Sequence, residues 1–187
     1  MAIKTGQSTE KDPEVALREV VAQIDQAEIA FILLFCSVRY DLDALSRGIS
    51  GAFPSISVIG CTTAGELGPL GHTSGGLVAA SFPSTEFTLA SATVTDAQAR
   101  DGHAMRAIFA DAKSRMGALP NRFAVLFVDG LSGMEEHISQ ACQSEFGDIP
   151  VVGGSSGDDE RYAATYILHG GAFSRGQTAI AAISTTR

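Results

Sequence analysis

The stretch VIGCTTAGE, residues 58–66, decides the fold once it is set beside VVGGSSGDD, residues 151–159. Each begins with the apolar residues of a buried strand and continues into glycines, hydroxyl side chains and acidic residues. The two stretches lie 93 residues apart in a chain of 187, so Val58 corresponds to Val151. This spacing of half the chain length suggests two related halves.

A second pair of segments supports the same division. Residues 31–35 read FILLF and residues 123–127 read FAVLF, a shift of 92. We expect two pseudo-symmetric halves, 12–94 and 95–187, preceded by a flexible segment at 1–11. The alternative is two unrelated strand–helix–strand units that share a common pattern of an apolar strand followed by glycine.

Hydrophobic periodicity and helix-capping residues predict an α/β fold with a mixed, largely parallel β-sheet flanked by helices. Expected helices span 12–27, 41–51, 95–116 and 134–146. Expected strands span 30–36, 55–61, 77–82, 86–94, 123–129 and 150–153, with a closing pair at 165–168 and 178–183. Turns rich in glycine should follow the strands at 55–61 and 150–153.

Composition narrows the class of protein. The net charge of −8 argues against general electrostatic binding to nucleic acid or an anionic membrane, since both require a basic surface. The three cysteines are widely spaced and form no CxxC pair, and the N-terminus lacks the apolar core of a signal peptide. We therefore expect a cytoplasmic protein.

The two turns are the candidate ligand site. In α/β sheets, ligands bind beyond the carboxyl ends of the strands, and rows of amides and hydroxyls can hold a polar or anionic group. Neither turn is a P-loop or a GxGxxG turn. One lip of the expected cleft would comprise Gly60, Cys61, Thr62, Thr63, Gly65 and Glu66. The other would comprise Gly153, Gly154, Ser155, Ser156 and Asp158.

The sequence contains only weak signals of a catalytic site or a metal site. Cys61 or Ser132 could serve as the nucleophile of a hydrolase, but the sequence places no histidine beside either, and GLSGM lacks the GxSxG pattern. The four histidines show no metal-binding spacing, although a single haem-ligating histidine would leave no such signature. We expect no catalytic activity and no metal site. A scaffold without any ligand is a third alternative.

With these residues assembled, the chain resembles the N-terminal domain of the FIST family of signal-transduction sensors. The resemblance is carried by FILLFC, ISVIGCTTAGELGP, GGLVAASF, FAVLFVDGLSG, IPVVGGSSGDD and the closing GGAF…AIAAIS. It covers nearly the whole chain from about residue 12. The spacing of the GCTTAGE and VVGGSSGDD segments is its most specific part.

The resemblance implies a small-molecule sensor that signals to a histidine kinase, a diguanylate cyclase or a methyl-accepting partner, with amino acids proposed as ligands. GCTTAGELGP is similar to a branch of haem-binding nitric-oxide sensors, which implies haem as a candidate cofactor. His72 adjoins that stretch and is the first candidate haem ligand. Family members usually continue into a C-terminal sensory domain, so we expect this chain to be a fragment.

Overall fold

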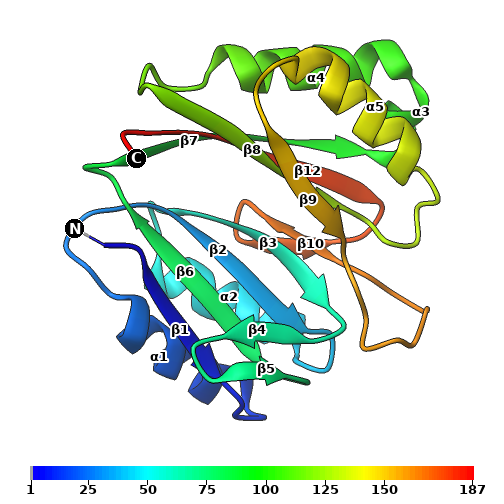
Figure 1. Ribbon diagram of the computed structural model, residues 1–187. Helices are drawn as coiled ribbons and strands as arrows, with labels where there is room; N and C mark the ends of the chain where they lie inside the picture. Colours follow the sequence, from blue (N-terminus) through cyan, green and yellow to red (C-terminus); the bar gives the residue numbers. More distant parts are fainter. Residues whose placement is uncertain (1) are drawn as a thin grey trace.

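The computed structural model describes residues 2–187 and shows four layers (Figure 1). Helices α1 and α2 cover a six-stranded sheet, and helices α3 to α5 cover a four-stranded sheet that lies against the first. The helices are α1 (Pro13–Ile24), α2 (Leu42–Ala52), α3 (Asp96–Arg100), α4 (Gly102–Ser114) and α5 (Glu135–Phe146).

Twelve strands complete the described chain. Those of the first sheet, in spatial order, are β1 (Lys4–Ser8), β6 (Leu77–Pro83), β2 (Ile29–Ser37), β3 (Ser57–Thr63), β10 (Ile167–His169) and β11 (Ala172–Ser174). Those of the second sheet are β7 (Phe87–Thr95), β12 (Gln177–Thr185), β8 (Asn121–Val128) and β9 (Val151–Ser155). The hairpin of β4 (Glu66–Gly68) and β5 (Gly71–Thr73) forms a separate two-stranded sheet.

The mixed α/β class is confirmed, but the expectation of one largely parallel sheet is wrong. Only β2 with β3 and β8 with β9 pair in parallel, and each of these pairs is joined by a crossover helix. Strand β6 lies between β1 and β2 and runs antiparallel to both. In the second sheet, β12 lies between β7 and β8 and also runs antiparallel to both.

Two further expectations differ from the structure. Lys4–Ser8 pair along their whole length with β6, so the expected flexible segment at 1–11 is wrong over these residues. The expected closing pair at 165–168 and 178–183 is also wrong, because β10 joins the first sheet and β12 the second. The strands of the hairpins β4–β5 and β10–β11 are three residues long, which is too short for hydrophobic periodicity to reveal them in the sequence.

Polar side chains fix the helix ends. Asp12 accepts hydrogen bonds from the Glu14 and Val15 amides at the start of α1, where Pro13 needs no partner. The single helix expected over 95–116 is divided because Asp101 has an extended backbone and caps α4. No helix within residues 2–187 is both long and apolar enough to cross a bilayer.

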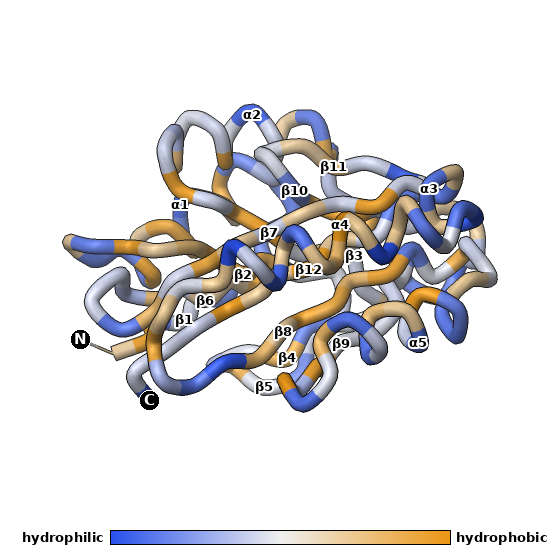
Figure 2. Tube along the Cα trace, turned by 90° about the horizontal axis from the view of Figure 1, so that it is seen from above, coloured by the Kyte–Doolittle hydropathy of each residue, from blue (hydrophilic) through white to orange (hydrophobic). Residues whose placement is uncertain are grey.

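Three apolar clusters fill the spaces between the layers. One lies between the first sheet and helices α1 and α2, and another between the second sheet and α4 and α5. The third lies between the two sheets and is rich in phenylalanine. Figure 2 shows the hydrophobic residues following the strands through the middle of the molecule, with hydrophilic residues at the outer loops. Burial on both faces explains the continuous apolar runs of β2 and β8.

The two halves have the same order of elements. The repeat divides after β6, not between residues 94 and 95 as expected, because β1 lies before residue 12 and β7 begins the second unit. In each unit a strand and its helix (two helices, α3 and α4, in the second) precede a strand–helix–strand unit, a short hairpin and a last strand. The strand orders β1-β6-β2-β3 and β7-β12-β8-β9 correspond one to one. Gly60 lies beside Leu34 and Gly153 beside Leu126 at corresponding register positions. Descent of both halves from one duplicated unit stays a prediction.

The shared glycines have one physical cause. A Cβ atom at Gly60 would lie 1.7 Å from the Leu34 carbonyl oxygen, and one at Gly153 would lie 2.0 Å from the Leu126 carbonyl oxygen. Any side chain would push the paired strands apart. Both glycines are therefore required by strand packing, and Gly60 to Thr63 continue β3 as a strand instead of forming the expected turn.

We predict that Gly60→Ala and Gly153→Ala each lower the free energy of unfolding by about 1–3 kcal/mol, the usual cost of overpacking. Gly60→Ala should cost more, because β3 has a partner on both sides whereas β9 lies at the edge of its sheet. Gly154→Ala is the matched control, since a Cβ there meets nothing within 4 Å. Urea unfolding measures all three. Equal stability of Gly60→Ala and Gly154→Ala would contradict this packing argument.

Candidate functional site

The structure brings the two predicted turns together. The Gly157 amide donates to the Thr62 carbonyl at 2.9 Å, and the Asp159 amide donates to the Thr63 carbonyl at 3.2 Å. A Cβ at Gly157 would lie 2.6 Å from the Ala64 nitrogen, so the backbones touch. The turns meet as a packed junction, and no open cleft of the expected kind separates them.

The hydroxyl groups at this junction already have partners within the protein. Thr62 Oγ1 accepts from the Tyr166 amide at 3.0 Å, and Thr63 Oγ1 donates to Glu66 Oε1 at 2.6 Å. Ser156 Oγ donates to the Val128 carbonyl and accepts from the Gly130 amide. These contacts stabilise the junction. That the two turns bind a ligand stays an untested prediction.

The carboxylates are also held internally. Asp158 is buried, which alone would raise its pKa, but amide donors from four residues, 161 to 164, lower it overall. Asp159 Oδ2 accepts from Ser37 Oγ at 2.7 Å and lies 3.1 Å from Arg39 Nε. Asp159 Oδ1 is buried without a hydrogen-bond partner among the described residues.

The remaining residues of the predicted site lie in different parts of the structure. Gly153, Gly154 and Ser155 lie on the outer strand β9, where they are exposed and line a groove beside α5. Cys61 is buried between the sheets, and burial raises the pKa of its thiol to about 12. A nucleophilic cysteine needs a lowered pKa, so this environment is the opposite of an activated one.

Neither Ser132 nor any metal-ligand group shows catalytic geometry. Ser132 Oγ accepts from the Met134 amide at 3.2 Å in a local turn before α5. Nearby Asp129 accepts hydrogen bonds from the Leu131 amide, the Thr165 hydroxyl and the Gly176 amide. Over residues 2–187, His, Cys, Asp and Glu side chains do not gather in threes as a metal site.

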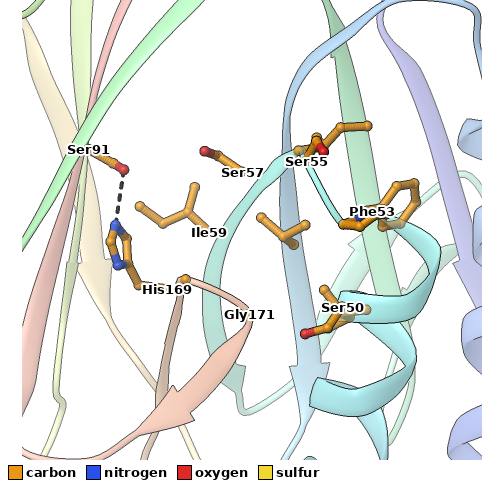
Figure 3. Close-up of a pocket in the computed structure, with 13 residues that line it drawn as sticks. Ser50, Phe53, Ser55, Ser57, Ile59, Ser91, His169 and Gly171 are labelled. Carbon is orange, nitrogen blue, oxygen red and sulfur yellow. Dashed lines mark hydrogen bonds between the residues drawn. The ribbon is translucent and has the colours of Figure 1, made fainter.

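A different cavity contains the better-formed site (Figure 3). Its volume is about 380 Å³, within the range of small-molecule pockets. The end of α2 and the start of β3 form one wall, while β7 and the turn of the β10–β11 hairpin form the other. The lining residues are Ile49, Ser50, Phe53, Pro54, Ser55, Ile56, Ser57, Val58, Ile59, Ser91, His169, Gly170 and Gly171.

His169 is the central polar group of this cavity. It ends β10 in the first sheet, and one ring nitrogen lies 3.0 Å from Ser91 Oγ on β7 in the second sheet (Figure 3). Burial lowers the pKa of His169, which keeps the imidazole neutral at neutral pH. The side chain therefore links the two sheets inside the cavity wall.

The hairpin turn positions His169. Gly170 and Gly171 both have positive φ, 62° and 80°, as a two-residue hairpin turn requires. This turn brings the hairpin to the end of α2, where a Cβ at Gly171 would lie 2.9 Å from Ser50 Oγ. Sequence reasoning missed the site, although His-Gly-Gly-Ala between apolar pairs is a recognisable hairpin signal.

Haem binding through a histidine stays an untested prediction. His72 is exposed on β5 and lines none of the cavities described above, and its Nε2 lies 2.7 Å from the position of a Cβ on Gly65. His169 already bonds Ser91, and its cavity is lined by serine hydroxyls rather than a continuous apolar slot.

Three comparisons with known proteins bear on the identity of the chain. None of the curated proteins matches the chain. Among solved structures, a cyanuric acid hydrolase from A. caulinodans is similar, with 13% identity and a TM-score of 0.45, over 100% of this chain and 72% of that chain. That likeness assigns no activity. The FIST N domain model matches residues 30–187. The chain therefore belongs to the FIST N domain family, whose members are sensory domains of signalling proteins.

Proposed function

We propose that this sensory domain binds a small, uncharged polar molecule in the cavity around His169. The observation that carries the proposal is the His169–Ser91 hydrogen bond, which joins the two sheets in the wall of a cavity large enough for a metabolite. A sensor must couple ligand binding to a change elsewhere in the domain. A polar link between layers, adjacent to an empty volume, is suited to that coupling.

The lining determines the chemistry of the ligand. None of the residues that line the cavity is Asp, Glu, Lys or Arg, and the lowered pKa of His169 keeps its ring neutral. Burying an ammonium or carboxylate group there would be costly, because no opposite charge compensates for the lost hydration. Serine hydroxyls and the imidazole can donate or accept hydrogen bonds, and Phe53 and Ile59 supply apolar contact. A neutral amide, lactam or polyol fits these groups better than a free amino acid.

The signal follows from competition for His169. A ligand that hydrogen-bonds the imidazole takes the place of Ser91 and loosens the link between β10 and β7. Binding then favours a conformation in which the two sheets meet differently at this end. The change is limited to the difference in ligand affinity between the two states. We propose a histidine kinase or diguanylate cyclase as the recipient, on the family resemblance alone.

A non-enzymatic role is part of the proposal. The buried, protonated Cys61 and the locally bonded Ser132 both lack an adjacent histidine among their described hydrogen-bond partners. His169 binds Ser91, and a serine–histidine pair alone lacks the acidic partner that orients the base in a catalytic triad. The cavity is therefore better suited to binding than to covalent chemistry.

We predict that uncharged amides, lactams or polyols raise the melting temperature of the wild-type chain, while charged amino acids do not. Stabilisation grows with ligand concentration and reaches about 2.7 kcal/mol at one hundred times Kd. Ser57→Trp places an indole in the cavity mouth and should abolish the response. Ser144→Trp, on the exposed side of α5, is the matched control and should retain it. A thermal-shift response unchanged in Ser57→Trp, or limited to amino acids, would contradict the cavity assignment.

The lowered pKa of His169 gives a second prediction. The folded pKa lies below the usual 6.5, so the unfolded chain binds more protons as the pH falls below 6.5, and His169 then reduces stability. Wild type should therefore lose more unfolding free energy than His169→Gln between about pH 8 and about pH 5. Urea unfolding at both pH values measures the difference. Equal losses in the two proteins would show that His169 is not held neutral by burial.

A further inference from the structure

The outer edge of β3 is covered by a hairpin from the other half of the chain. Strand β10 pairs antiparallel with β3, with Leu168 opposite Gly60 and Ile167 opposite Cys61. Leu168 is fully buried in the cluster beneath α1 and α2, and Phe173 from β11 packs against the same cluster. The hairpin therefore covers the outer edge of β3 and packs against the cluster beneath α1 and α2.

The corresponding strand of the second half, β9, has no such cover. It is the last strand of its sheet, and its residues 152–155 are exposed, whereas residues 58–62 of β3 are buried. Val152 is 58% exposed, an unusual state for a strand valine. A groove of about 240 Å³ lies between β9 and α5. An uncovered edge with unpaired amides and carbonyls is a site for strand addition.

The chain also carries an uncovered hairpin. The β4–β5 hairpin occupies the place in the first half that β10–β11 occupies in the second. Both have three-residue strands and a two-residue turn, with Leu67 opposite His72 and Leu168 opposite Phe173. Leu67 thus corresponds to the buried Leu168, yet it is 78% exposed, and Leu70 in the turn is 70% exposed.

We propose that β4 of one copy of this chain adds to β9 of a second copy. The pairing is antiparallel and places Leu67 opposite Gly153, as Leu168 lies opposite Gly60 within one chain. Leu67 enters the groove beside α5. Reciprocal exchange gives a symmetric dimer with two such contacts, and closure avoids an open filament. Each contact consists of backbone hydrogen bonds between β4 and β9 and the burial of one apolar side chain, Leu67. Because the contacts are small, the association is weak and depends on concentration.

Sedimentation velocity over a concentration series tests the proposal with three variants. Wild type should show a sedimentation coefficient that rises with concentration, whereas Val152→Lys and Leu67→Lys should each sediment as monomers. Both residues are exposed, so both variants should keep the wild-type melting temperature. Tyr162→Ser is the matched control: it removes an 81% exposed aromatic side chain outside β4 and β9 and should still associate.

Mixing the two monomeric variants is the decisive step. Val152→Lys keeps an intact hairpin and Leu67→Lys an intact edge, so the mixture should form dimers through one contact, more weakly than wild type. A mixture that stays monomeric while wild type associates would overturn the hairpin-to-edge pairing. Wild type that remains monomeric up to about 1 mM, or Val152→Lys that associates normally, would overturn it as well.

Discussion

The packing of one sheet face to face against the other is the constraint on which the rest of the structure depends. Phe31 stacks on Phe82 with ring centroids 4.4 Å apart and meets Phe87 edge-on at 6.4 Å, and Phe35 contacts Phe127 across the sheets at 5.9 Å. With helices on the outer faces, both sides of the central strands are buried. Polar chemistry is therefore confined to the strand ends, the edges and the junctions between halves.

The β10–β11 hairpin is where this constraint gives rise to the site that we propose. The hairpin belongs to the second half by sequence but extends the sheet of the first half. Its turn creates the cavity against α2 and places His169 within reach of Ser91 on the opposite sheet. One short element thus covers an edge, completes a pocket and links the layers. The corresponding β4–β5 hairpin lines a cavity beside β6, but it covers no strand edge of the second sheet within one chain, and its leucines are exposed.

Local signals in the sequence were sufficient for most of the long strands and for several helix ends, but not for the division of the helix expected over 95–116 or for β1. The apolar runs of β2 and β8, the caps at Asp12 and the paired Gly60 and Gly153 all reflect neighbours close in sequence or register. The division into two sheets was not predictable, because it depends on where β6 and β12 insert. The cavity around His169 was not predictable for a related reason, because it forms where a hairpin of the second half meets α2 and β3 of the first. The hydroxyl groups of serine- and threonine-rich turns can hydrogen-bond backbone groups within a packed junction as readily as they can bind a ligand, and the sequence does not distinguish the two.

Hydrogen-exchange mass spectrometry, with and without an uncharged compound that stabilises the chain, tests the central claim most directly. If the ligand binds beside His169, binding should alter exchange in peptides from the end of α2 into β3, and in the β10–β11 hairpin. The β7 peptide containing Ser91 should exchange faster, because its link to His169 is lost. Changes confined instead to residues 62–66 and 153–159 would contradict the account and return the ligand to the paired turns.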